Sequence, residues 1–168
     1  YHNEINKNQI DQFVKFLDNL EIKKKYKYFK FKNYYKLITN NNSVAICIRR
    51  GDFLNFNSNS SDQFFFDSIK FLNDKFDNLS FFFFSDDMIW VKKNFHSKNF
   101  YYVDLKNKPS HLNIILISLC NHAVISNSTL HLCGASLIKN KNSMIIYEKE
   151  WKLAEKFNFI KFSHLAKS

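Results

Sequence analysis

The chain contains little glycine and proline. Its 168 residues include only two glycines and one proline. A glycine-rich phosphate loop and the G-x-G-x-x-G dinucleotide fingerprint each need several glycines close together, so the sequence has neither motif. Asn takes their place as the turn residue, because Asn tolerates positive φ better than most side chains. Any phosphate group must therefore be held by side chains and helix ends.

Cysteine is also scarce, and no apolar run is long. The three cysteines, Cys47, Cys120 and Cys133, follow no zinc-binding spacing and lie in apolar segments, so buried free thiols are predicted. No apolar run reaches the roughly 20 residues of a transmembrane helix. The amino terminus has no basic and apolar signal segment. These absences predict a cytoplasmic location, and peripheral contact with the inner face of a membrane stays open.

The charge of the chain is strongly positive, at +10. Such an excess points to an anionic partner, which leaves nucleic acid, a phosphorylated small molecule and an acidic membrane surface as candidates. Single-stranded nucleic acid requires exposed aromatic rings in a basic groove. Most of the 20 phenylalanines instead fall in runs and stripes that are typical of a core. We therefore expect no nucleic-acid partner.

The order of apolar segments predicts an α/β fold. Residues 8–20 carry apolar side chains at helical spacing, whereas 22–42 are basic and aromatic and are predicted as a connector with at most one short strand. From residue 43 onward, strands are expected at 44–48, 79–84, 100–103, 123–126 and 143–147, and helices at 62–77, 87–95, 111–121, 129–138 and 151–157. This alternation predicts a Rossmann-like parallel sheet flanked by helices, with right-handed crossovers.

Two adjacent arginines follow the first predicted strand. Arg49 and Arg50 come directly after the apolar run 44–48 and precede Gly51 and Asp52. Ligands of open α/β sheets bind beyond the carboxyl ends of the strands, and a guanidinium can grip two phosphate oxygens at once. The position and the chemistry therefore favour a diphosphate site. The alternative is a surface pair that forms ion pairs with Asp52.

Polar residues follow two further strands. Asp86 and Asp87 could accept hydrogen bonds from ribose hydroxyls or a guanine edge, or could simply begin a helix as its cap and first-turn acid. Asn127, Ser128 and Thr129 stand at a predicted helix start, where amides and hydroxyls can bind an anion as well as cap the helix. His122 is expected to be structural. His131 could face the cleft, although no sequence feature requires it.

Three segments together resemble glycosyltransferase family 11, the α-1,2-fucosyltransferases. Ile46–Phe53 is similar to the family motif His-x-Arg-Arg-Gly-Asp-Tyr, and Phe84–Trp90 to Phe-Ser-Asp-Asp-x-x-Trp. Ser118–Thr129 is similar to the block Ser-x-Cys-x-His…Ile-x-Asn-Ser-Ser, and Gly134-Ala135 to the Gly-Ala that follows it. The segments occur in the family's order and spacing over about residues 43–150. Three motifs in register make the resemblance specific.

The resemblance implies a GT-B-type enzyme that transfers L-fucose from GDP-β-L-fucose to the 2-hydroxyl of a galactoside, with inversion and without a metal or other cofactor. The implied product belongs to a glycan or a surface polysaccharide. Residues 43–168 would form the Rossmann-like GDP-sugar domain, and residues 1–42 would be a helix and connector left from an amino-terminal acceptor domain. The chain would then be a fragment or a truncated gene product, since family members are longer.

The resemblance also assigns roles to single residues. Arg49 would bind the diphosphate and stabilise the departing GDP, so it is the expected catalytic residue. Arg50 and Asp52 would support the same loop, and the remaining expected substrate-binding residues are Asp86, Asp87, Asn113, Asn127, Ser128 and Thr129.

The chain departs from the family pattern at three places. Cys47 stands where the motif has His, and Asn113 where related enzymes have an Asp that faces guanine. Residues 130–133 replace an aromatic Phe-Ser-Trp-Trp. A catalytically inactive remnant that binds a nucleotide sugar is therefore the alternative to an active enzyme.

Overall fold

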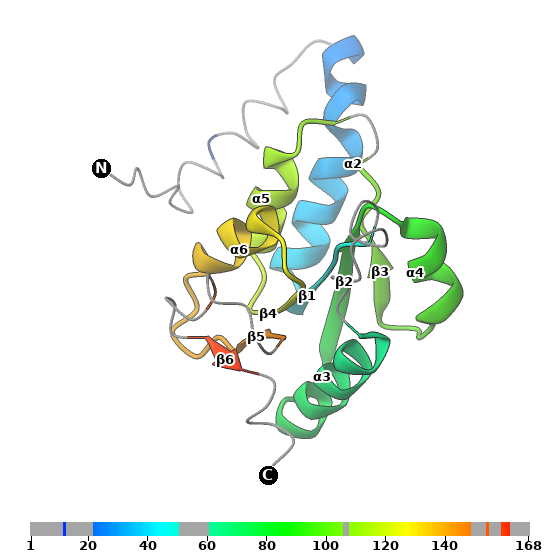
Figure 1. Cartoon of the computed structure of the whole chain (residues 1–168). Helices are drawn as coiled ribbons and strands as arrows, with labels where there is room; N and C mark the ends of the chain where they lie inside the picture. The colour runs from blue at the N-terminus through cyan, green and yellow to red at the C-terminus, as the bar shows by residue number, and fades with distance from the viewer. Residues whose placement is uncertain are drawn as a thin grey trace.

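The computed structural model describes Gln12 and residues 22–50, 61–105, 108–148, 154 and 159–161. Its centre is a parallel sheet with the strand order β3-β2-β1-β4-β5-β6 (Figure 1). The strands are β1 (Asn42–Ile48), β2 (Leu79–Ser85), β3 (Phe100–Tyr102), β4 (His122–Ile125), β5 (Ile145–Tyr147) and β6 (Ile160–Lys161). This is the Rossmann order, which confirms the predicted fold class. The order reverses between β1 and β4, and ligands bind at such a switch point.

Helices cover both faces of the sheet (Figure 1). The described helices are α2 (Ile22–Thr39), α3 (Asp62–Lys75), α4 (Met88–Asn94), α5 (His111–Ser118) and α6 (Thr129–Ser136). Helices α3 and α4 pack on one face, and α2, α5 and α6 pack on the other. Each predicted strand from 44 to 147 and each predicted helix from 62 to 138 has a counterpart, with ends that differ by a few residues.

Strand β1 contributes side chains to two hydrophobic cores, one on each face of the sheet. Val44, Ile46 and Ile48 belong to the core under α3 and α4, whereas Ala45 and Cys47 belong to the core under α2, α5 and α6. Successive side chains of a strand point to opposite faces, so a strand covered on both sides reads as a continuous apolar run. The same rule decides where the residues after β1 point.

Helix α2 differs from the prediction. Residues 22–42 were expected to form a connector, but Ile22–Thr39 is helical and packs against the sheet through Phe31 and Ile38, both 1% exposed. Phe31, Tyr35 and Ile38 do have helical spacing. Further aromatic residues on the other sides of the helix, such as the exposed Phe29, hide that stripe.

The cysteine prediction holds for two of the three residues. Cys47 and Cys120 are buried free thiols, but Cys133 is an exposed free thiol on α6. Its neighbours Leu132 and Gly134 are buried, so the residue lies on the outer side of an otherwise packed helix. Strand β6 was not predicted, because two residues are too short to give a pattern. The helices predicted over 8–20 and 151–157 fall outside the described residues, apart from Gln12 and Ala154.

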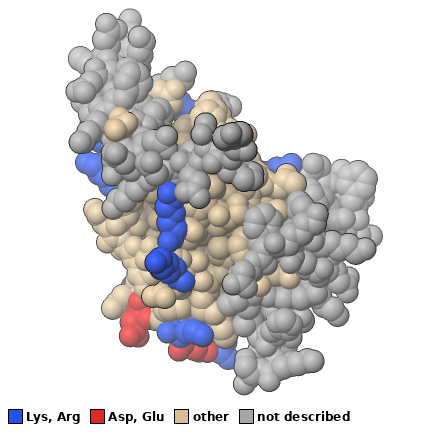
Figure 2. Space-filling model, turned by 90° about the vertical axis from the view of Figure 1, so that its left-hand side faces the viewer, with Lys and Arg blue, Asp and Glu red and all other residues tan. Residues whose placement is uncertain are grey.

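Basic side chains cover little of the described surface on the face drawn in Figure 2. The largest basic areas are one narrow stripe and a small group at the lower edge, where acidic side chains adjoin that group, and most of the remaining described surface is uncharged. A groove lined with basic residues, as nucleic-acid binding requires, is not seen in the described part of this face. Within the described ranges, no helix is both long and apolar enough to cross a bilayer.

Candidate functional site

The two adjacent arginines point to opposite faces of the sheet. Cys47 faces α5 and α6, and Arg49 continues on that side, whereas Ile48 faces α3 and α4, and Arg50 continues toward those helices. The alternation of β1 therefore extends for two residues beyond the strand. The arginines have different surroundings as a result.

Arg49 lies at the edge of a pocket. Its backbone N–H donates to Ser126 Oγ at 2.9 Å, which joins the ends of β1 and β4. Its guanidinium forms an ion pair with Asp86, with 3.1 Å between Nη1 and Oδ2, and its side chain is 37% exposed. Arg49 is therefore fixed at its backbone, and its side chain is partly accessible.

Arg50 is held between α3 and α4. Its Cζ lies 3.7 Å from the centre of the Trp90 ring. Its guanidinium contacts the carboxylates of Asp62 at 3.4 Å and Asp87 at 3.7 Å. Its side chain is 16% exposed, and its backbone N–H donates to Asp86 Oδ1 at 2.9 Å. These contacts fit the predicted support of the loop. Direct contact of Arg50 with substrate stays a prediction, and Asp52 lies outside the described residues.

Asp86 and Asp87 also separate. Asp86 bridges the backbone of Arg50 and the guanidinium of Arg49, and it borders the pocket. Asp87 is the N-cap of α4 and accepts a hydrogen bond from the backbone N–H of Trp90 at 3.0 Å. The helix-cap interpretation therefore holds for Asp87, and the position of Asp86 agrees with a site role.

The start of α6 closes the pocket on the side of β4. Ser128 is the N-cap of α6 and lines the pocket, but its side chain makes no capping hydrogen bond. Asn127 has a buried Oδ1 without a hydrogen-bond partner among the described residues. Thr129 is exposed and is the first residue of the helix. Of these three residues, the structure brings only Ser128 to the pocket wall.

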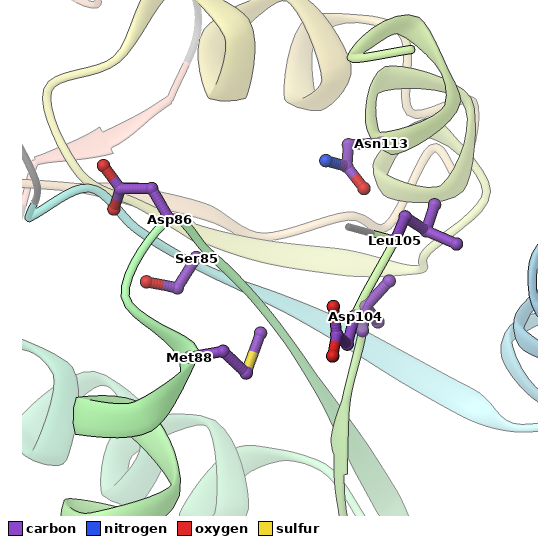
Figure 3. Close-up of a pocket in the computed structure, with 7 residues that line it drawn as sticks. Ser85, Asp86, Met88, Asp104, Leu105 and Asn113 are labelled. Carbon is purple, nitrogen blue, oxygen red and sulfur yellow. The ribbon is translucent and has the colours of Figure 1, made fainter. Parts of the chain in front are cut away.

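Two adjoining pockets open at this edge of the sheet. The first, of about 220 Å³, is lined by Arg49, Phe84, Ser85, Asp86, Ser110, Asn113, Ser128, Leu130 and His131. The second, of about 190 Å³, is lined by Ser85, Asp86, Met88, Val103, Asp104, Leu105 and Asn113. Figure 3 shows the Asn113 side chain reaching from α5 into the second pocket, across from the end of β2. The two pockets are neighbours, because they share Ser85, Asp86 and Asn113. The Oδ1 atom of Asn113 is buried and has no hydrogen-bond partner among the described residues.

Among the residues of the site, Asp104 and Ser126 were not predicted, and His131 was named only as a residue that could face the cleft. Asp104 follows β3 and lines the second pocket, Ser126 holds Arg49, and His131 lines the first pocket. Asp104 could have been found, because it follows a predicted strand as Asp86 does. Ser126 acts through its contact with Arg49, 77 residues away in the sequence, whereas His131 reaches the pocket through the packing of α6. His122, by contrast, is structural as expected, since it is buried and its Nδ1 accepts from the backbone N–H of Met144.

The described residues contain no group of three or more His, Cys, Asp or Glu that could hold a metal ion. Metal independence and a cytoplasmic location both stay predictions. Among the described lining residues, the polar groups are one guanidinium, two carboxylates, one amide, three hydroxyls and one imidazole. Such a set can bind a phosphorylated ligand with hydroxyl groups through charge and hydrogen bonds.

Comparison with known proteins identifies the family. The model of glycosyl transferase family 11 matches residues 1–162. An α-1,2-colitosyltransferase of Escherichia coli is 31% identical over 127 residues, which cover 70% of this chain and 43% of that protein. The O-antigen biosynthesis glycosyltransferase WbnK of Escherichia coli is 27% identical over 128 residues, covering 70% of this chain and 42% of that protein. The matched part thus spans less than half of either relative, and no solved structure gives a significant match. The chain belongs to glycosyl transferase family 11.

Proposed function

We propose that the protein transfers a 6-deoxy sugar, L-fucose or colitose, from its GDP derivative to the 2-hydroxyl of a galactoside in a surface polysaccharide. Family membership and relatives named for colitosyl transfer and for O-antigen biosynthesis support this class of reaction. Colitose is L-fucose without its 3-hydroxyl, so one type of donor site could take either sugar. A galactoside 2-α-L-fucosyltransferase, as expected from the sequence, is one form of this proposal.

The position of Arg49 carries the proposal. Its guanidinium lies at the switch point between β1 and β4, opposite Ser128 at the start of α6. A diphosphate in the first pocket would meet a fixed positive charge on one side and a helix amino terminus on the other. Asp86 would hold the guanidinium in place through the 3.1 Å ion pair.

The second pocket suits a nucleoside. Met88 and Leu105 offer apolar surface, and Asp86, Asp104 and Asn113 offer polar groups. Carboxylates accept hydrogen bonds from ribose hydroxyls and from the N–H groups of guanine, whereas an amide can also donate to a carbonyl oxygen. The two adjoining pockets would then hold the nucleoside and the diphosphate of one ligand.

The proposed reaction is an inverting displacement at the anomeric carbon. The acceptor oxygen forms the new glycosidic bond as the bond to the β-phosphate oxygen breaks, and negative charge accumulates on the departing GDP. Arg49 would oppose this charge in a partly dry pocket, where one such contact is worth about 3–4 kcal/mol of barrier. The reaction needs no electron transfer, and the acceptor's proton is lost to solvent or to a base.

A nucleotide panel tests the proposal. Thermal shift with GDP, GDP-fucose, GDP-colitose, UDP and ADP should show stabilisation by the guanosine nucleotides, since ligand binding to the native state alone raises stability. Turnover should then be measured with both GDP-sugars and a galactoside acceptor. Stabilisation by UDP or ADP alone would contradict the proposal.

The same panel separates the alternative function. Cys47 is fully buried, and burial raises the pKa of its thiol well above the usual value. The thiol therefore offers neither an exposed donor nor a nucleophile where the motif has His. A protein that binds GDP but turns over neither donor would be the nucleotide-sugar-binding remnant.

A further inference from the structure

His131 is a site residue to which neither the family motif nor the proposed reaction gives a role. It lies in the first turn of α6, is 6% exposed, and lines the same pocket as Arg49 and Ser128. Among the described residues that line this pocket, His131 is the only histidine.

Ser126 links His131 to Arg49. Ser126 Oγ accepts from the backbone N–H of Arg49 at 2.9 Å and lies 3.3 Å from His131 Nδ1. Ser126 is 1% exposed, so its hydroxyl proton needs an acceptor within the protein. Among the described residues, His131 Nδ1 is the acceptor within reach. The neutral tautomer that gives this hydroxyl an acceptor is the one with its proton on Nε2, in which the hydroxyl donates to Nδ1.

The surroundings keep this imidazole neutral. The pKa of His131 falls from 6.5 to about 4: burial is the largest cause, the nearby carboxylate of Asp86 opposes it, and the guanidinium of Arg49 adds to the lowering. Arg49 follows β1, Asp86 follows β2, and Ser126 follows β4, so these groups face the ring from each strand end around it. Within the described chain, no group accepts a hydrogen bond from Nε2. Nε2 of this pocket-lining residue is therefore left without an acceptor among the described residues.

We propose that His131 is a substrate-binding residue whose Nε2–H donates a hydrogen bond to an oxygen of the diphosphate held beside Arg49. This inference rests on the proposed function, because it takes the ligand of the first pocket to be a nucleoside diphosphate sugar. Ser126 would then align both donors, Arg49 through its backbone and His131 through Nδ1. Hydrogen bonds to an anionic acceptor are among the strong ones, so the contact adds measurably to affinity.

A matched pair of substitutions separates this role from packing. In His131→Asn, the amide can occupy the position of Nδ1 and keep the contact with Ser126, but it does not reach the pocket. In His131→Gln, the longer amide can present an N–H near the position of Nε2. We expect His131→Asn to weaken the binding of GDP and of inorganic pyrophosphate about tenfold, and His131→Gln to stay within about threefold of the wild type.

A measurement on the wild-type chain supplements the variants. Imidazole ¹⁵N resonances should show His131 as the Nε2–H tautomer, and the Nε2 signal should move when GDP is added. An Nδ1–H tautomer, or an Nε2 signal that saturating GDP leaves unchanged, would overturn the inference. This readout does not require either variant to fold.

The outcomes distinguish the two proposals. GDP binding that is lost in Arg49→Ala but unchanged in His131→Asn would leave the proposed function in place and overturn the role of His131. Equal losses in His131→Asn and His131→Gln would assign the residue to packing and also overturn it. Failure of the wild type to bind either GDP or pyrophosphate would overturn the proposed function and the role of His131 together.

Discussion

The guanidinium of Arg50 lies over the ring of Trp90, with 3.7 Å between its Cζ and the ring centre. Trp90 is in the first turn of α4, and its backbone N–H donates to Asp87, the N-cap of that helix. Arg50 therefore ties the end of β1 to the start of α4. The two arginines share one motif, but Arg50 contributes to the frame of the site, whereas Arg49 borders the pocket.

Replacing Trp90 should loosen this frame. Trp90→Leu removes the aromatic face beneath Arg50, and we expect the free energy of unfolding to fall by about 1–2 kcal/mol, since cation–π contacts of partly buried groups have this size. Trp90→Phe keeps an aromatic ring and should lose less. Urea denaturation of both variants measures the difference. Equal losses would show that the stacking on Arg50 adds nothing.

Gly134 should tolerate no larger residue. A Cβ at this position would lie 2.7 Å from Cγ2 and 2.8 Å from Cβ of Ile117, which is fully buried on α5. Gly134→Ala forces α5 and α6 apart, and such overpacking costs about 1–3 kcal/mol. Ser136→Ala, at an exposed position of the same helix, is the control. A Gly134→Ala variant as stable as the control would contradict the close approach of the two helices.

His131 should make stability depend on pH. Its pKa falls from 6.5 to about 4 in the folded chain, so the unfolded chain binds the proton more tightly. The stability that the neutral His131 contributes to the folded state is fully present above about pH 6.5 and is lost as the pH falls toward 4. Between about pH 7.5 and about pH 5, the wild type should lose roughly 2 kcal/mol more than His131→Gln, because only the wild type has this group.

Urea denaturation of the two proteins at both pH values measures that difference. Burial also lowers the pKa of His122. Because His122 is present in both proteins, its effect cancels in the difference between their stabilities. Parallel loss of stability in the two proteins would mean that His131 is not held neutral by its surroundings.

The strands and the site edge could be predicted from the sequence because their signals are local. Runs such as Phe81–Phe84 are buried on both faces, and the polar residues that follow each run lie at the carboxyl edge of the sheet by the geometry of parallel strands. The motif resemblance added the family. Asp86 and Ser128 were expected at the site for these reasons, and both line the pocket.

The rest depends on contacts between distant segments. The burial of Cys47 and Ile48 on opposite faces explains why Arg49 and Arg50 diverge, but the sequence did not say which face carries the pocket. The link between Arg49 and Ser126 joins residues 77 positions apart, and it forms only when β1 and β4 pair. Helix α2 was missed because its buried stripe is surrounded by further aromatic residues.

Calorimetric titration of the wild type and Arg49→Ala with GDP tests the central claim most directly, with Lys70→Ala as a control that removes one exposed positive charge on α3. Arg49 is held at the mouth of the pocket by Ser126 and Asp86, so its loss should weaken GDP binding about a hundredfold, while Lys70→Ala binds as the wild type does. An Arg49→Ala variant that binds GDP with wild-type affinity would contradict the account.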